Sequence, residues 1–388
     1  MFARSRMSVI KRRPLLCLSI ALFIFAIFVR YHIYSLSNED VVILKEWYRH
    51  FYRNGKASLA NGNFSNYTPL YLYLLWITRL FSNWFDSIVA IKIIPTAFDF
   101  LSAYAIFLIA RINFDNDKPY LFSALFFALP TIMFNSTGWG QIESLYTSFL
   151  LLCVYFLLRD KPIYAMIMFG VAFSLKSQSI FFLPFLGVLF LKGRIRWFHF
   201  LLVPIMYVVL AIPAAWIGRS WASILSIYIG QVGQFHSLSM SAPNLYVFVS
   251  DSFYQIGVWI GMGVFLIAMA IWGWINWRAK IACNHRQIML MALAALTLVP
   301  FFLPKMHDRY FYPADVFSFA TIIFVPEMWF VPILYQLISC LSYSIFILNA
   351  STAYVMAAAL INTGVVIYIL YKQFLSLSEH HNEDAHAV

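Results

Sequence analysis

The residues best suited to chemistry lie in one short stretch, 305–315. Five Lys, His, Asp or Arg side chains fall within these eleven positions, directly after an apolar run: Lys305, His307, Asp308, Arg309 and Asp315. Arg309 can hold a phosphate through two parallel hydrogen bonds, and Lys305 can add a compact positive charge. Tyr310 and Tyr312 offer flat apolar faces beside them. This mixture suits a phosphorylated lipid or a sugar.

Two other groups of polar residues lie in apolar surroundings. Trp139, Gln141 and Glu143 follow one hydrophobic run, and Lys176 and Gln178 follow another. Each group alone has an ordinary structural explanation. Gln141 and Glu143 suit the first turn of a helix, and Lys176 suits a cation that reaches toward the membrane surface. Neither group identifies a site by itself.

Asp99 lies in the middle of the apolar run 88–110. A carboxylate inside a membrane helix is costly, so it is usually functional or paired. We therefore expect Asp99 either to belong to the site or to hold a neighbouring helix by hydrogen bonds. His236 and Asn244 lie in the long polar segment 218–251, where a single histidine carries little information.

The composition places these residues in a membrane protein. The chain is 62% hydrophobic and 11% charged, it contains 39 Phe, 23 Tyr and 12 Trp, and its mean hydropathy is +0.77. A soluble domain cannot bury so much apolar surface, because its exterior must meet water. Runs of about 17–20 apolar residues, long enough to cross a ~30 Å hydrocarbon layer, recur along the chain. We predict an all-α polytopic membrane protein.

The net charge of +11 does not indicate a nucleic-acid partner, because the basic residues are scattered in short segments between the apolar runs. The cysteines show no paired spacing, so neither a disulfide framework nor a zinc site is predicted: Cys17, Cys153, Cys283 and Cys340. No metal-ligand set or cofactor is predicted from the residues, although use of a divalent metal is left open.

A single polytopic domain is expected over residues 15–371, between a cytoplasmic N-terminus at 1–14 and a cytoplasmic tail at 372–388. The polar residues 376–388 of this tail are expected to be disordered. The basic N-terminus resembles a signal peptide, but no small-residue cleavage site follows, so an uncleaved first helix is expected. Residues 36–86 are expected to form a structured first outer loop. Helical spacing at 41–51 predicts an interfacial helix, and the Tyr- and Trp-rich segment 67–76 predicts a second surface or shallow re-entrant helix.

About twelve transmembrane helices are predicted. They are the first helix from residue 15 and the runs 88–110, 119–134, 142–158, 163–176, 179–191, 197–217, 253–276, 287–303, 314–327, 330–348 and 351–371. Most basic loops then face the cytoplasm, as the positive-inside rule expects, whereas one more crossing at 67–82 would reverse them. The same alternation puts the polar motifs on the outer face: 39–40, 139–144, 176–179, 218–251 and 305–315.

The order of these motifs resembles the polytopic GT-C glycosyltransferases. An acidic pair follows the first helix, and Tyr67-Thr-Pro69-Leu-Tyr71 comes next. Trp139-Gly-Gln-Ile-Glu143-Ser, Lys176-Ser-Gln178 and Lys305-Met-His-Asp-Arg-Tyr310 complete the series. The likeness covers about 36–315 and extends to bacterial proteins related to the GPI mannosyltransferases and to dolichyl-phosphate-glucose-dependent glucosyltransferases. Glu143 and Asp308 replace the Asp and Glu that the family more often has, and both keep the charge.

The resemblance implies a GT-C-like fold and an inverting transfer of a hexose, of the mannosyl type, from a polyprenyl-phosphate sugar at the outer face. The implied acceptor is a lipid-linked, glycan or protein hydroxyl. In that family an acidic residue seven or eight positions before a Trp is the catalytic base, and Trp47 fits both Glu39 and Asp40. Asp40 is slightly favoured because it directly precedes the spacing of the interfacial helix.

The resemblance and the residue chemistry together assign the other candidate roles. The expected donor and phosphate ligands are Lys176, Gln178, Lys305, His307, Arg309 and Tyr310. The expected substrate ligands are Trp139, Gln141, Glu143, His236, Asn244 and Asp308.

A lipid-sugar flippase or transporter and an oligosaccharide polymerase are the alternatives. A transporter should show related halves and polar residues near mid-membrane, and neither is found in the sequence. A polymerase should centre on a long late loop with arginines, whereas segment 218–251 contains only Arg219. The expected location is the bacterial inner membrane with the site outside, or the endoplasmic reticulum in a eukaryote. The expected partners are therefore the sugar donor, the acceptor and membrane lipids, with no nucleic acid.

Overall fold

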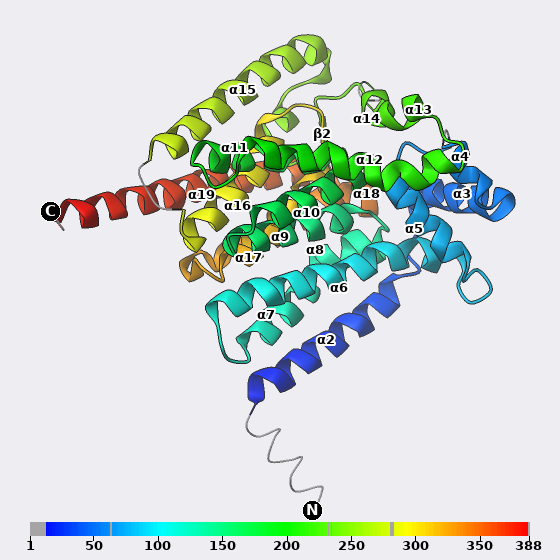
Figure 1. Ribbon diagram of the computed structural model, residues 1–388, viewed down its shortest axis with the longest axis horizontal. Coiled ribbons are helices and arrows are strands. Elements are labelled where there is room, and N and C mark those ends of the chain that lie inside the picture. The colour runs from blue at the N-terminus through cyan, green and yellow to red at the C-terminus, as the bar shows by residue number, and fades with distance from the viewer. Residues whose placement is uncertain (1–12, 63, 232, 234, 280–282, 387–388) are drawn as a thin grey trace, which may run out of the picture.

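The computed structural model describes residues 13–62, 64–231, 233, 235–279 and 283–386, and helices account for most of them (Figure 1). The α-helices are α2 (Pro14–Ile33), α3 (Glu39–Asn54), α4 (Ala57–Ala60), α5 (Pro69–Arg79), α6 (Ser87–Asn113), α7 (Lys118–Phe127), α8 (Pro130–Met133), α9 (Glu143–Leu158), α10 (Pro162–Leu175), α11 (Leu183–Leu191), α12 (Leu202–Trp216), α13 (Trp221–Leu225), α14 (Ile227–Gly230), α15 (Tyr254–Arg278), α16 (His285–Phe302), α17 (Tyr312–Thr321), α18 (Phe330–Leu348) and α19 (Ala353–His386).

Shorter elements connect these helices. One turn is a π-helix, η1 (Phe134–Gly138). The 3₁₀ turns are η2 (Ser177–Phe182), η3 (Trp197–Leu201), η4 (Leu245–Phe248), η5 (Asp251–Phe253), η6 (Asp308–Phe311) and η7 (Pro326–Met328). Two strands of two residues each, β1 (Ser239–Met240) and β2 (Met306–His307), pair in parallel and join the segment before α15 to the segment after α16.

An all-α polytopic membrane protein is confirmed. Among the described residues, seven helices are long and apolar enough to cross a membrane, or eight if the bent pair at 118–127 and 130–138 is one span. Four other predicted spans correspond to α9, α10, η2 with α11, and α17, which are shorter than 18 residues. The count of twelve therefore stays a prediction.

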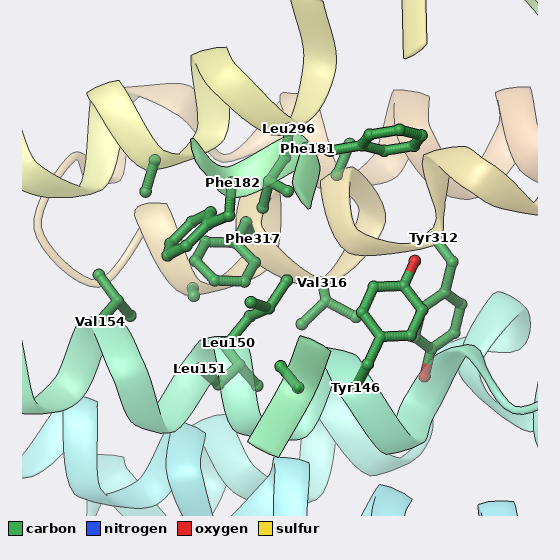
Figure 2. Packing of buried hydrophobic residues seen from close by; sticks show 14 of the residues in the cluster. Tyr146, Leu150, Leu151, Val154, Phe181, Phe182, Leu296, Tyr312, Val316 and Phe317 are labelled. Carbon is green, nitrogen blue, oxygen red and sulfur yellow. The ribbon is translucent and has the colours of Figure 1, made fainter. Parts of the chain in front are cut away.

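The core of the bundle forms around α9, which packs against α6 and α10 on its flanks and also contacts α16 and α17. Its buried residues include Tyr146, Leu150 and Val154, which recur every four residues and so share one helix face. Figure 2 shows this face meeting Phe182, Leu296, Val316 and Phe317. This packed centre is the frame that holds the ends of α9 and α10, where the polar motifs lie.

The predicted first outer loop is helical, as expected. Asn38 caps α3 by accepting a hydrogen bond from the Val41 backbone N–H at 3.0 Å. One face of α3 buries Val41, Leu44, Tyr48 and Phe51. At 11 residues, α5 is about 16 Å long, which is too short to cross a bilayer. The short helices α3, α4, α13 and α14 gather at one end of the bundle, at the right of Figure 1.

The chain ends differ from expectation in one respect. The backbone of α19 remains helical to His386, so residues 376–386 continue the last helix, where a disordered segment was expected. The first helix begins at Pro14, close to the predicted start. The basic N-terminal residues up to position 12 lie outside the described part of the chain.

The topology predicted from the sequence can be tested by labelling. In a background without other cysteines, we expect the native Cys283 to react with a membrane-impermeant thiol reagent only from the cytoplasm. We expect a cysteine introduced as His236→Cys, at an exposed position, to react from outside. Reaction of His236→Cys only after permeabilisation would invert the topology.

Candidate active site

A cavity of about 740 Å³ lies where the polar motifs meet. Its wall combines α3, the turn at 66–68, the junction of α10 with η2, the segment 228–240 and the stretch 305–310. The charged residues on this wall are Asp40, Lys176, Lys305 and Arg309, and His307 lies beside them. Three cations face one carboxylate, so the cavity favours an anionic ligand.

Asp40 is the acidic residue of the pair that faces the cavity. Its Oδ2 accepts hydrogen bonds from Trp139 Nε1 at 2.9 Å and from Gln141 Nε2 at 2.8 Å. Within the described residues, Oδ1 accepts no hydrogen bond. Glu39 is exposed and does not line the cavity. Adjacent helical residues point about 100° apart, which explains why only one of the two can face the site.

A sharp turn presents the two donors to Asp40. The π-helix η1 ends at Gly138, and π-helical turns often mark functional sites. Gly140 follows with φ +78°, a left-handed conformation that glycine adopts without strain. Trp139 is 1% exposed and lies behind the wall, whereas Gln141 reaches the cavity. We expected both as substrate ligands, and the structure places Trp139 as a buried support for Asp40.

Arg309 lies between three carboxylates. Its guanidinium approaches Asp40 at 3.6 Å, Glu143 at 3.5 Å and Asp308 at 3.8 Å. Its Nε is buried without a hydrogen-bond partner among the described residues. Trp139 lies under the guanidinium, with the ring centroid 5.7 Å from Cζ. That buried Nε faces Glu143, whereas the two terminal nitrogens form no hydrogen bond within the described residues. Arg309 is thus balanced in charge, and its terminal nitrogens remain as donors for a ligand in the cavity.

Lys176 pairs with Glu143 behind the same wall. Glu143 is fully buried, so it holds Lys176 and does not face the cavity. Gln178 Nε2 donates a hydrogen bond to the Tyr310 hydroxyl at 2.9 Å, and the Tyr310 ring lies 5.9 Å from the Lys176 ammonium. The two distant motifs therefore contact each other directly.

Lys305 reaches the cavity from a constrained backbone. Its φ is +65°, which is unusual for a residue other than glycine, and its N–H donates to the Leu238 carbonyl at 2.7 Å. The pairing of β1 with β2 fixes the two residues that follow, Met306 and His307. Its ammonium lies 5.6 Å from the centroid of Tyr254. This local strain is of the kind that persists where the surrounding structure holds a functional residue in place.

Comparison with known proteins identifies the family. The model of glycosyltransferase family 87 matches residues 64–304, more than half of the chain. The chain belongs to glycosyltransferase family 87. No curated protein matches the sequence. A membrane glycosyltransferase is thereby confirmed, which disfavours the flippase and transporter alternatives. The matched region contains the Trp139 and Lys176 motifs but neither Asp40 nor the stretch 305–315.

His307 and Asp308 of this family 87 glycosyltransferase have strongly shifted pKa values. Burial, together with the nearby cations Arg309 and Lys176, lowers the pKa of His307 to about 3. The imidazole is therefore neutral near pH 7 and can donate only one hydrogen bond. Burial raises the pKa of Asp308 to about 7, against the opposing attraction of Arg309. Asp308 is 4% exposed and lies behind the cavity wall.

The pKa of Asp308 predicts how stability depends on pH. The folded-state pKa lies above the ordinary 3.8, so folding favours the protonated carboxyl. This contribution is fully present below about pH 4 and is lost as the pH rises through about 7. The amide of Asp308→Asn is neutral at every pH. We therefore expect the melting temperature of this variant at pH 8 to exceed the wild-type value by several degrees. At pH 4 the difference should vanish. Asp115→Asn, at an exposed site, is the control, and equal pH profiles for Asp308→Asn and wild type would contradict the prediction.

Lys92 was missed from the sequence. It lies on α6 and is 2% exposed, and its ammonium donates to three backbone carbonyls: Tyr34 at 2.8 Å, Leu36 at 2.6 Å and Gly138 at 2.7 Å. It thus ties the chain that leads to Asp40 to the turn that presents Trp139. The signal that marked Asp99, a charge within an apolar run, applies equally to Lys92.

Lys92→Met should therefore damage both stability and turnover. The substitution keeps the length of the side chain but leaves three buried carbonyls without their donor. We expect the unfolding free energy to fall by roughly 2–4 kcal/mol. Thermal unfolding in detergent measures the loss. Lys56→Met makes the same change at an exposed position in the segment 36–86, so it is the matched control and should change stability little. A melting temperature of Lys92→Met equal to that of the control would contradict this role.

Asp99 lies away from the cavity. It pairs with Arg30 of α2 at 2.8 Å, and Arg30 also donates to Ser136 and Thr137 of η1. The expected pairing of this intramembrane carboxylate with a neighbouring helix is observed. The Asp99–Arg30 pair therefore supports the turn that precedes Trp139.

Two further predicted ligands do not reach the cavity, in addition to Trp139, Glu143 and Asp308. Asn244 is fully buried, and its side chain donates to the carbonyls of Pro300 and Leu303, so it fastens the outer segment to α16. His236 is exposed beside Tyr254. Within the described part of the chain, no group of three or more His, Cys, Asp or Glu side chains is placed to hold a metal ion.

Proposed function

We propose that this family 87 glycosyltransferase transfers a hexose of the mannosyl type from a polyprenyl-phosphate sugar to a hydroxyl group of a lipid-linked, glycan or protein acceptor. The transfer inverts the anomeric carbon and takes place at the extracytoplasmic face of the membrane. The observation that supports this proposal most directly is that Asp40 shares one cavity wall with three cations, Lys176, Lys305 and Arg309. Its Oδ1 accepts no hydrogen bond within the described residues. A volume of about 740 Å³ is in the range of small-molecule sites.

Each residue has a stated part in the reaction. Asp40 Oδ1 takes the proton of the acceptor hydroxyl as that oxygen bonds to the anomeric carbon. The bond from this carbon to the phosphate oxygen breaks on the opposite side, and its electron pair stays on the phosphate. The phosphodiester becomes a monoester with one more negative charge. Arg309 and Lys305 on the cavity wall stabilise this charge.

The supporting residues act through these groups. Trp139 and Gln141 hold Asp40 Oδ2, so the proton is taken at the other oxygen. Glu143 holds Lys176, and His307 as a neutral imidazole can donate one hydrogen bond to the donor. Apolar side chains on the same wall, among them Leu44, Ile180 and Phe181, suit contact with a prenyl chain.

The test is a reconstituted assay. Purified protein in nanodiscs is incubated with radiolabelled polyprenyl-phosphate mannose or with the same sugar on a nucleotide, in the presence of a membrane lipid extract. We expect label to enter the acceptor fraction only from the polyprenyl donor. Transfer from the nucleotide donor alone would overturn the proposed donor. A parallel assay with polyprenyl-phosphate glucose distinguishes the sugar.

A further inference from the structure

We infer that a second cavity, at the opposite end of the bundle, binds the phosphate headgroup of an anionic membrane lipid. This basic pocket has a volume of about 290 Å³. Its charged and titratable lining residues are Asp160, Lys161, Arg194, Arg196 and His199. Three cations against one carboxylate leave a net charge of +2, so the pocket favours an anion.

The position of the basic pocket follows from α9. Glu143, at the first residue of α9, holds Lys176 of the active-site cavity, whereas Leu157, near the last residue, lines the basic pocket. The helix has 16 residues and is therefore about 24 Å long. The two cavities thus lie at opposite membrane faces, and the predicted topology puts the basic pocket on the cytoplasmic side. The inference does not depend on the proposed sugar donor.

The turns that carry the cations are fixed by hydrogen bonds. The Lys161 N–H donates to the Phe156 carbonyl at 2.8 Å, and the Arg194 N–H donates to the Leu189 carbonyl at 2.9 Å. Each bond joins an N–H to the carbonyl five residues earlier and closes the C-terminus of a helix. The residue before the donor, Asp160 or Gly193, has a positive φ in each turn. A cation near a helix C-terminus also stabilises the helix dipole. Stabilisation of the helix dipole explains why each turn carries a cation. It does not explain why the two turns enclose a common cavity.

The side chains leave donors for a ligand. Asp160 pairs with Arg194. Within the described part of the chain, neither Lys161 nor Arg196 forms an ion pair, and each is exposed. His199 Nδ1 accepts a hydrogen bond from the Arg196 N–H at 3.2 Å, so a neutral His199 carries its hydrogen on Nε2. A phosphate in the pocket can therefore receive bonds from two cations and one imidazole.

The surroundings favour a lipid over free phosphate. Next to the pocket residues, Tyr164 is 54% exposed, Leu191 50% and Trp197 67%. These large apolar side chains are exposed on the surface of the bundle beside the pocket. Tyr and Trp favour the headgroup level of a bilayer. Basic pockets between helices on the cytoplasmic side are a recurrent form of anionic headgroup site.

The test compares two variants that lose the same charge. Lys161→Gln/Arg196→Gln removes two cations of the basic pocket. Arg111→Gln/Arg278→Gln removes two exposed cations that the topology places on the same face but that do not line the pocket. Native mass spectrometry of detergent-purified protein titrated with phosphatidylglycerol or phosphatidylcholine measures binding. We expect the first variant to lose phosphatidylglycerol affinity by on the order of 10-fold, and the control to change by less than about twofold.

Three outcomes would overturn the inference. Equal losses in both variants would show attraction by overall charge alone. Equal binding of phosphatidylcholine would exclude recognition of anionic headgroups. Displacement of the lipid by millimolar inorganic phosphate would show a free-phosphate site. Melting temperature in phosphatidylcholine nanodiscs checks folding. Because Lys161→Gln and Arg196→Gln are also measured singly, the inference is tested even if the double variant does not fold.

Discussion

Asp40→Asn is expected to lower sugar transfer by roughly 10²- to 10⁴-fold, the usual cost of losing a general base. The amide cannot accept the proton of the acceptor hydroxyl. It can still accept the hydrogen bonds that Trp139 and Gln141 now give to Oδ2, so the fold and donor binding should persist. The measurement is kcat in the reconstituted assay, with donor affinity determined separately.

Glu39→Gln is the matched control for Asp40→Asn. It makes the same chemical change one residue earlier, at an exposed side chain that is off the cavity wall. We expect near-normal turnover. If Glu39→Gln abolished transfer and Asp40→Asn did not, the assignment of the base would be reversed. If neither changed turnover, the base would lie elsewhere in the cavity.

The choice between Glu39 and Asp40 shows where sequence reasoning ends. Both residues stand at a suitable distance from Trp47, so spacing alone cannot separate them. The start of α3 separates them, because the cap by Asn38 sets the helical phase and buries Val41 and Leu44. With that face packed inward, Asp40 faces the cavity and Glu39 faces solvent.

The motifs themselves could be found from the sequence because charge is rare in an apolar chain. Lys176 and Arg309 stand out for this reason, and they line one cavity although 133 positions separate them. The membrane class and the outer-loop helices follow from the same composition and spacing. The sequence could not show which polar residues reach the surface of the cavity. Trp139, Glu143 and Asp308 are of residue types that bind substrates, yet they lie behind the cavity wall.

Long-range pairs were also beyond the sequence. Asp99 was noticed, but its partner Arg30 is 69 residues away, and no local pattern connects them. Lys92 could have been noticed as a charge in an apolar run, but its partners are backbone carbonyls of three separate residues, which no sequence pattern identifies. Such contacts depend on where helix ends meet, which is set by the packing of the whole bundle. They support the site without belonging to any motif.

Arg309→Lys is expected to lower kcat/KM for the polyprenyl donor by roughly 10- to 10²-fold, equivalent to about 1.5–3 kcal/mol of charge-assisted hydrogen bonding. Lysine keeps the charge but loses the planar fork that binds phosphate through two parallel bonds. The guanidinium approaches three carboxylates at 3.5–3.8 Å, and its two terminal nitrogens form no hydrogen bond within the described residues. The geometry therefore leaves donors whose loss should be felt by the ligand.

Arg49→Lys, on the exposed face of α3, is the matched control and should leave kcat/KM unchanged. Because Arg309 also balances the charges of Glu143 and Asp308, part of any loss could come from a weakened fold. A melting temperature for each variant separates that effect. The decisive comparison is donor binding against turnover. If Arg309 stabilises the growing negative charge on the phosphate, its replacement should lower kcat more than it weakens donor binding. The reason is that its hydrogen bonds strengthen as the phosphodiester becomes a monoester. Unchanged turnover in a stable Arg309→Lys, with Arg309→Gln also near normal, would remove Arg309 from the phosphate site and leave Lys176 and Lys305 as its cations.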